Sequence, residues 1–269
     1  MTKMLRWPVV LMLLAAPALA IDITAPGQTV PRGQVGVLQA DLSCAPSALG
    51  VFLDDGATLE MNGHALDGCF VGGAGLSRVD IAVHGPGLIR HAGIAIRQGT
   101  LRARDVAIQD SPSFGIIGSG SSEDGPSTLR LQHVTVTVSG LDGIVATKVV
   151  ARDVTSSGNG VAALGWGVIG WGGVKGRNLI VSGNNAEGVF SNVRVTLRDA
   201  QVTGNARGGV ISVGISRSAL TIMRSTVTGN DAQDGADLAS QRKPRVRDST
   251  CGSSLDVQAQ VPWGVCAND

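Results

Sequence analysis

The sequence of 269 residues contains no tyrosine, four phenylalanines and four tryptophans, so aromatic residues make up only 3% of it. A core formed by this chain must therefore consist mostly of Val, Ile, Leu and Ala. Neither sign of charge is in excess, because the chain has 22 Lys and Arg and 21 Asp and Glu, which give a formal net charge of +1. This balance gives no reason to expect nucleic acid or an anionic membrane as a partner.

Long apolar runs are missing after residue 20, so no membrane span is expected in the mature chain. Residues 1–20 differ from the rest. Lys3 and Arg6 come first, an apolar segment runs from Trp7 to Ala16, and small residues ending at Ala20 follow. This order is typical of a secretory signal peptide, and the apolar segment is too short to cross a bilayer. We therefore expect a secreted or periplasmic protein.

Cysteine is also scarce, with Cys44 and Cys69 near one end and Cys251 and Cys266 near the other. In an exported protein this favours two local disulfides, Cys44–Cys69 and Cys251–Cys266, although three connectivities are possible. A metal site is disfavoured, because there is no Cys-x-x-Cys pair and no His beside the C-terminal cysteines. Such bridges would fasten the two ends of the chain, where open strand edges are expected.

The sequence does contain a repeat. Residues 195–205 read VTLRDAQVTGN, and residues 220–230 read LTIMRSTVTGN. Apolar and polar residues alternate within each copy, which is the pattern of a strand with one buried face. Copies start 20 to 28 residues apart, at Leu101, Leu129, Val149, Val174, Val195, Leu220 and Pro244. A repeat of this length indicates a solenoid.

One polar residue interrupts the alternation in every copy. Asp and Asn tolerate left-handed backbone conformations, so this column is expected at a tight corner. It consists of Asp105, His133, Asp153, Asn178, Asp199, Arg224 and Asp248. A second short strand follows, and then a third strand that starts with a Gly-apolar pair. These pairs are Gly115-Ile116, Gly143-Ile144, Gly160-Val161, Gly188-Val189 and Gly209-Val210. Three short strands per copy predict one coil of a parallel β-helix.

Two segments outside the repeats resemble a known group of proteins. Residues 58–64 read TLEMNGH and residues 84–89 read HGPGLI, and both are similar to phrases that recur in the right-handed parallel β-helix, pectate-lyase-like superfamily. The resemblance covers about residues 35–255 and implies an all-β, single-domain solenoid of about ten coils. The expected organisation is a signal peptide at 1–20, an N-terminal cap and first coil at 21–50, the β-helix at 51–255 and a C-terminal cap at 256–269. The superfamily includes lyases, hydrolases, epimerases and adhesins, so the resemblance does not define a chemistry.

The strongest candidate for ligand binding is the segment 165–173, which reads GWGVIGWGG. We interpret it as a glycine-rich loop inserted after the third strand of its coil. Trp166 and Trp171 do not fit a core there, and together with Phe190 they are the expected ligand-binding residues, because sugars stack on aromatic rings. The alternative is a loop folded onto its own surface. The expected partner is a polysaccharide or another component of the cell envelope.

Enzymes of the superfamily commonly work on the face of the third strand. The residues expected to point outward there are apolar: Ala95, Ile117, Val145, Ala162, Phe190 and Ile211. Hydrolysis of a glycoside needs two carboxylates roughly 5 to 9 Å apart, and this face supplies none. Flanking loops offer catalytic candidates whose alternative interpretation is solvated turn residues, namely Asp142, Glu187, Arg207, Asp231 and Asp234.

Three functions therefore remain. The favoured one is a non-catalytic, glycan-binding protein without a cofactor. The second is a polysaccharide lyase or glycoside hydrolase that acts on an acidic polysaccharide through the loop residues, with calcium if it is a lyase. The third is an adhesive or self-associating protein that uses the apolar row on the third strand, since a contiguous exposed apolar stripe usually marks an interface.

Two further columns are interpreted as structural. Asn159, Asn184, Asn205 and Asn230 are expected to form a hydrogen-bonded ladder from coil to coil. An outward column of arginines precedes the corner and is expected to pair with its acids, with an acidic polysaccharide as the alternative partner. This column consists of Arg104, Arg152, Arg177, Arg198 and Arg247.

Overall fold

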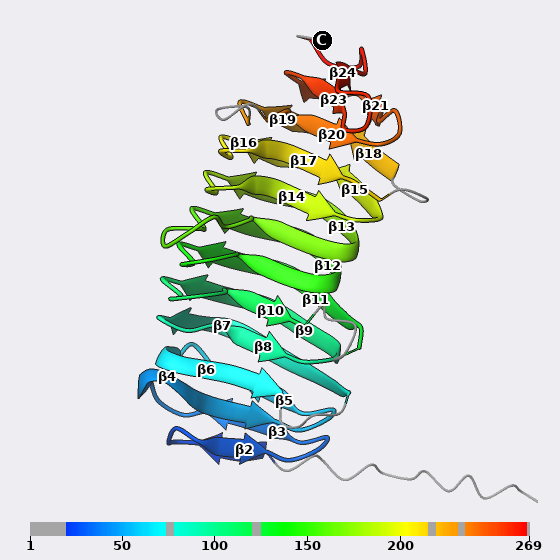
Figure 1. Cartoon of the computed structure of the whole chain (residues 1–269). Coiled ribbons are helices and arrows are strands. Elements are labelled where there is room, and N and C mark those ends of the chain that lie inside the picture. Colours follow the sequence, from blue (N-terminus) through cyan, green and yellow to red (C-terminus); the bar gives the residue numbers. More distant parts are fainter. Residues whose placement is uncertain (1–19, 74–77, 120–124, 215–218, 231–234, 268–269) are drawn as a thin grey trace, which may run out of the picture.

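The computed structural model describes residues 20–73, 78–119, 125–214, 219–230 and 235–267. Within these ranges the regular elements are all strands, and they stack into one solenoid of about nine turns (Figure 1). Their pairings are parallel, apart from the antiparallel pairing of the last two strands, β23 and β24. The all-β, single-domain, right-handed parallel β-helix expected from the sequence is confirmed.

The strands become longest in the middle of the solenoid, where one strand runs around a corner from one side to the next. The N-terminal strands are β1 (Ala20–Ile23), β2 (Gln28–Val30), β3 (Val35–Leu38), β4 (Leu42–Leu53), β5 (Thr58–Glu60), β6 (Ala65–Gly73), β7 (Val79–Arg90) and β8 (Ile94–Ile96). The central strands are β9 (Gly99–Gln109), β10 (Ile116–Gly118), β11 (Ser127–Thr137), β12 (Ile144–Ser157), β13 (Val168–Ser182), β14 (Glu187–Ser191), β15 (Arg194–Arg198) and β16 (Gln201–Thr203). The C-terminal strands are β17 (Gly208–Ser212), β18 (Ala219–Met223), β19 (Thr226–Thr228), β20 (Leu238–Ser240), β21 (Arg245–Arg247), β22 (Thr250–Cys251), β23 (Ser254–Asp256) and β24 (Val261–Pro262).

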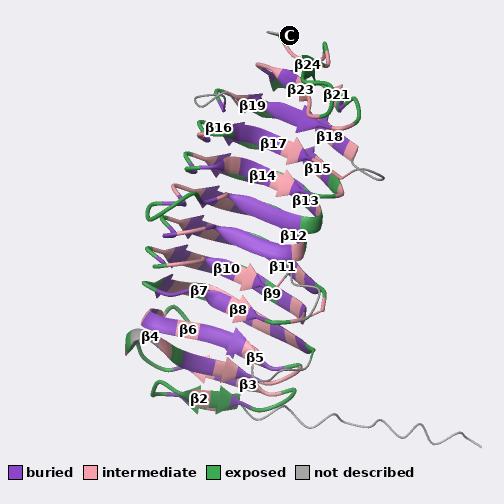
Figure 2. Cartoon of the chain, viewed as in Figure 1, coloured by how far each residue is buried: buried purple, intermediate pink, exposed green. Residues whose placement is uncertain are grey.

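Each coil contributes three strand segments, and stacked segments form three sides. We call them the first-, second- and third-strand faces; in one coil they are represented by β15, β16 and β17. Val195 of β15 pairs in parallel with Val174 below and Leu220 above, so the starts of the sequence repeats lie in one column. Apolar residues of these columns point inward and form one continuous buried core (Figure 2). The starts of the sequence repeats therefore give the register of these first-strand segments.

The polar corner column adopts the conformation expected from its residue types. All seven members have positive φ, from 46° at Arg224 to 56° at Asp105. Their side chains connect neighbouring coils. The Asn178 Nδ2 donates to Asp153 at 2.6 Å, and Arg224 donates to Asp199 through Nε at 2.7 Å and an NH2 group at 2.8 Å. The bond from Arg224 also lowers the pKa of Asp199 below its ordinary value.

The asparagine ladder is present and buried. Asn159, Asn184 and Asn205 each donate from Nδ2 to the Oδ1 of the asparagine in the next coil at 2.7 Å, and Asn230 ends the series. The last amide donates to Asp237 Oδ1 at 2.8 Å. Asp237 is therefore a buried cap of the ladder.

The glycine of the Gly-apolar pair is required by the same ladder. A Cβ at Gly188 would lie 2.7 Å from Asn205 Nδ2 and 2.8 Å from the carbonyl oxygen of Gly209. At Gly167 the corresponding distances, to Asn184 Nδ2 and the carbonyl oxygen of Gly188, are both 2.7 Å. A side chain has no room at either position, so each coil needs glycine where the third strand begins.

One register expected from the sequence is wrong. The expectation placed the start of a third strand at Gly160-Val161 and a loop at 165–173. In the structure Val168 pairs with Ile144 and Val189, so Gly167-Val168 is the true pair. The insertion precedes the strand, and β13 runs without interruption through Trp171. Val161 is instead 70% exposed in this insertion. Two Gly-apolar pairs lie close together in the sequence, and only contact with the next ladder asparagine distinguishes them.

The two ends are fastened as expected. Disulfides link Cys44 to Cys69 and Cys251 to Cys266, with Cα atoms 5.1 and 5.0 Å apart. At the C-terminal end Trp263 donates its indole N–H to the carbonyl oxygen of Ser240 at 3.3 Å. Residues 1–19, which hold nearly all of the expected signal peptide, lie outside the described residues.

Candidate functional site

Two of the three expected ligand-binding residues meet on the third-strand face. Trp171 follows the third-strand segment of β13, and Phe190 lies in β14 of the next coil, paired with Ile169. The rings contact edge to face, with centroids 5.6 Å apart and planes inclined by 74°. Trp171 is 36% exposed, whereas Phe190 is half-buried. We call Trp171 and Phe190 the aromatic pair; it offers an exposed apolar edge on a rigid strand.

Trp166 is not part of the aromatic pair. It precedes the third-strand segment, whereas Trp171 follows it, a separation of roughly 15 Å along an extended chain. Its backbone N–H donates to Asp142 Oδ1 at 2.9 Å. Its indole N–H is buried and has no partner among the described residues. The two tryptophans of this short segment therefore lie in different environments.

Two of the expected catalytic acids share a row with Trp166. The Gly143 N–H donates to the Trp166 carbonyl at 2.9 Å, and the Gly167 N–H donates to the Glu187 carbonyl at 3.1 Å. Asp142, Trp166 and Glu187 thus occupy equivalent positions on three successive coils. The two carboxyl groups belong to coils roughly 10 Å apart, with Trp166 between them.

Asp142 and Glu187 are less exposed to solvent than the alternative interpretation, as solvated turn residues, would require. Asp142 is buried, and this burial raises the pKa of its carboxyl group, while the hydrogen bond from the Trp166 N–H acts in the opposite direction. Glu187 is half-buried, and its Oε2 has no hydrogen-bond partner within the described part of the chain. Arg207 is exposed, and Asp231 and Asp234 lie outside the described residues.

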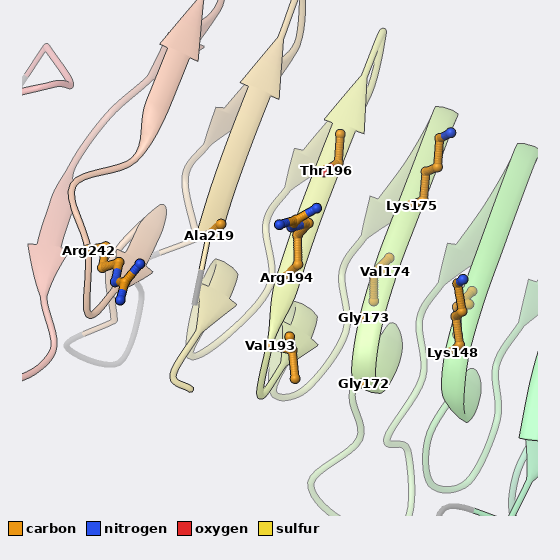
Figure 3. A pocket seen from close by; sticks show the side chains of 11 residues that line it. Lys148, Gly172, Gly173, Val174, Lys175, Val193, Arg194, Thr196, Ala219 and Arg242 are labelled. Atoms are coloured by element: carbon orange, nitrogen blue, oxygen red, sulfur yellow. The ribbon is translucent and has the colours of Figure 1, made fainter. Parts of the chain in front are cut away.

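A hollow close to the aromatic pair was not expected from the sequence. It is a groove of about 670 Å³ at the corner between the third- and first-strand faces, and Figure 3 shows Lys148, Lys175 and Arg194 on three neighbouring strands beside it. Gly172 and Gly173, which directly follow Trp171, form part of its wall. We call it the basic groove, and its cationic residues are Lys148, Lys175, Arg194 and Arg242.

Small residues create this groove. Lys148 pairs with Gly173, and Arg194 pairs with Ala219, so long side chains alternate with missing or short ones from coil to coil. No acidic side chain is among the lining residues. Lys148, Lys175 and Arg194 also form no ion pair with any described residue. The groove is therefore positively charged. In the sequence, this groove corresponds to cations at alternate positions of a strand. That pattern indicates a groove only once the pairing between coils is known.

The apolar row of the third-strand face is less exposed than expected. Val145 is buried, and Ile117, Phe190 and Ile211 are half-buried. Ala162 does not belong to the row, because the register correction replaces it by Ile169, which is 1% exposed. A contiguous exposed apolar stripe is therefore absent from the described part of this face. What remains is a hollow of about 450 Å³ lined by residues that include Leu49, Ala95, Ile117 and Val145.

Neither a metal-binding cluster nor a membrane-spanning helix is found in the described ranges. No group of three or more His, Cys, Asp or Glu side chains there is arranged to hold a metal ion. In the same ranges, no helix has the length and apolar character to cross a membrane.

The geometry defines a right-handed parallel β-helix that carries an aromatic pair and a basic groove. No known protein family matches the sequence, and no curated protein matches it either. Among solved structures, the chain is similar to the A-module of the mannuronan C-5 epimerase AlgE4 of Azotobacter vinelandii, with a TM-score of 0.54. That likeness covers 88% of this chain and 78% of the other, at 15% identity. At this identity it shows a shared fold.

Proposed function

We propose that the protein is an exported, non-catalytic β-helix that binds a glycan at the aromatic pair and the adjoining basic groove. The observation that carries this proposal is the exposed edge of Trp171, which is held against Phe190 at 5.6 Å and is followed directly by the groove wall. Sugar rings present apolar C–H faces and polar edges. An aromatic surface beside polar and charged groups suits both.

Rigidity supports a binding role. Trp171 and Phe190 lie on or next to paired strands of adjacent coils, so their backbones are fixed by the solenoid. A site that is already ordered loses little conformational entropy when a ligand binds. Export is supported by the basic and apolar pattern of residues 1–20 and by two disulfides, which persist in oxidising compartments. The structurally similar protein is a mannuronan epimerase, which is in keeping with a glycan partner.

The test measures retention of the disulfide-bonded protein on an array of neutral and acidic glycans. We expect the double variant Trp171→Ala/Phe190→Ala to lose at least about tenfold in affinity, since each aromatic contact contributes of the order of 1 kcal/mol. Ile180→Ala is the matched control, because Ile180 is an exposed apolar residue of the same strand, β13, and is 42% exposed. The proposal fails if the wild type binds no glycan, or if the double variant and the control bind alike.

A hydrolase or lyase is the second candidate, favoured by the row that contains Asp142 and Glu187. Asp142 has a raised pKa and Glu187 has a buried oxygen without a partner, which are properties of catalytic acids. Their separation of roughly two coils is at the upper limit for a glycosidase pair. Release of reducing or unsaturated ends from acidic polysaccharides, with and without calcium, tests this. Activity that Glu187→Gln abolishes would replace the non-catalytic proposal.

A further inference from the structure

From β9 onward the outward positions of the first-strand face are unusually basic, whereas earlier segments of this face carry Glu60 and Asp80. From β9 to β21 each first-strand segment has up to three such positions, and all of the basic residues there are exposed. No Asp or Glu occupies any of these positions in the seven segments. The cations are Arg102, Arg104, Arg130, Lys148, Arg152, Lys175, Arg177, Arg194, Arg198, Arg245 and Arg247. These eleven residues, half of the 22 Lys and Arg in the chain, are called the basic face.

Strand pairing arranges the basic face in rows parallel to the solenoid axis. Arg102 pairs with Arg130, and two coils further on Lys175 occupies the same row. A neighbouring row contains Arg152 and Arg177, which pair directly. Members of one row are therefore roughly 5 or 10 Å apart. This is comparable to the Debye length at physiological ionic strength, so their potentials add.

The rows differ in how far they are neutralised. Cations next to the corner lie beside its acids: Arg152 is 3.3 Å from Asp153, and Arg177 and Arg198 share Asp199 at 3.9 and 3.6 Å. The other rows have no such partners within the described residues. Their members are Arg102, Arg130, Lys148, Lys175, Arg194 and Arg245. An overall charge of +1 therefore hides a local excess of cations on this part of the solenoid.

The basic face is hollowed at two places. One is the basic groove at Lys148, Lys175 and Arg194. The other, of about 310 Å³, lies further toward the N-terminal end and is lined by His84 and by four arginines. These are Arg102, Arg104, Arg130 and Arg152. Both hollows are lined in part by cations of the basic face, so they can provide successive sites for one extended molecule.

We propose that the basic face binds a linear acidic polysaccharide that lies along the solenoid axis and spans both hollows. This names the class of ligand and rests on the proposed function, since it takes the ligand to be a glycan. The regular spacing of the coils suits a polymer that repeats an anionic group, and Arg and Lys form charge-assisted hydrogen bonds with carboxylates and sulfates. The outward positions of this face hold no aromatic residue, which is the residue type that stacks on the bases of single-stranded nucleic acid.

The experiment compares binding of polygalacturonate, polymannuronate and dextran sulfate with binding of neutral dextran over a series of salt concentrations. We expect acidic polymers alone to bind, with an affinity that falls steeply as salt rises. The triple variant Lys148→Gln/Lys175→Gln/Arg194→Gln should weaken binding by about 10- to 100-fold, from three exposed charge contacts. It should also flatten the salt dependence.

A matched control removes three cations from elsewhere on the solenoid. Arg32→Gln/Arg78→Gln/Arg90→Gln changes the net charge equally, but none of these residues belongs to the basic face. Its affinity should stay within about twofold of the wild type. Equal losses in both triple variants would show a non-specific charge effect and overturn the proposal. Circular dichroism of each variant verifies that the β-helix is intact.

The outcomes separate this inference from the proposed function. If neutral glycans bind as well as acidic ones and the basic-face variant behaves as the wild type, the inference fails while glycan binding stands. If the Trp171→Ala/Phe190→Ala variant binds acidic polymers normally and the basic-face variant does not, the inference stands without the aromatic pair. Tighter binding of single-stranded DNA, or of vesicles containing anionic phospholipid, than of every polysaccharide would overturn the assignment to a glycan.

Discussion

The buried asparagine ladder allows a sharp test of how neighbouring coils are held together. We consider Asn205→Ala in the middle of the ladder. Asn205 Oδ1 accepts two hydrogen bonds from Asn184, one from Nδ2 at 2.7 Å and one from the backbone N–H at 3.1 Å. Asn205 Nδ2 donates to Asn230 Oδ1 at 2.7 Å. Alanine removes these three bonds and the longer bond from Asn205 Nδ2 to the Val181 carbonyl at 3.3 Å, at a position with no solvent exposure.

The loss of stability follows from the groups that remain behind. Two donors of Asn184 lose their acceptor, and although its Nδ2 also reaches the Ser156 carbonyl at 3.4 Å, that bond is long. A buried donor without a partner costs about 1 to 3 kcal/mol, so two of them predict a loss of about 3 to 4 kcal/mol. For a domain of this size the melting temperature should fall by roughly 10 °C.

Urea and thermal unfolding followed by circular dichroism measure this loss. Asn185→Ala is the control, because Asn185 is the exposed neighbour of the ladder and donates only to the Gly160 and Ala163 carbonyls at 3.2 Å. Its effect should stay below about 0.5 kcal/mol. Asn205→Asp should be at least as damaging as Asn205→Ala, since a carboxylate keeps the acceptors but opposes Asn230 Oδ1. Equal stability of Asn205→Ala and the control would refute the role of the ladder.

Three further predictions concern the fold. Gly188→Ala should cost about 2 to 4 kcal/mol in urea unfolding, because its Cβ would approach Asn205 Nδ2 to 2.7 Å; a neutral effect would contradict the steric explanation of the glycine column. The raised pKa of Asp142 means that the folded state holds its proton more tightly than the unfolded state, so stability falls as pH rises through that pKa. Asp142→Asn should therefore melt higher than the wild type at pH 7, and the advantage should vanish below the ordinary carboxyl range; a pH-independent difference would be inconsistent with this cause. Replacing both Cys251 and Cys266 by Ser opens a bridge with a sequence separation of 15 and should cost about 3 kcal/mol, which the urea midpoint reports.

Several features follow from the sequence because they depend on local chemistry repeated at a fixed interval. The corner residues have positive φ because Asp and Asn tolerate it, and the repeat places one in each coil even where His133 or Arg224 substitutes. The ladder asparagines follow a glycine at the same point of four consecutive copies, so their alignment could be read without coordinates. Proximity in sequence favoured the two disulfides among three possible connectivities, because each closes a short segment at one end.

Other features were settled by contacts between coils. The sequence offered Gly160-Val161 and Gly167-Val168 as alternative starts of one strand, and packing of Gly167 against Asn184 selected the second. That choice moved Trp171 onto a strand beside Phe190 and left Trp166 with Asp142. The expected single loop with two tryptophans therefore became two separate environments.

The sequence by itself determined the solenoid, its coil length, its corners and its ladder, because each is a property of one repeat unit. The tertiary structure decided which side chains share a surface, because loops of unequal length separate the strands and only pairing between coils sets their offset. Lys148 and Arg194 are far apart in the chain, but both border the basic groove, since Gly173 lies between them and leaves the space open.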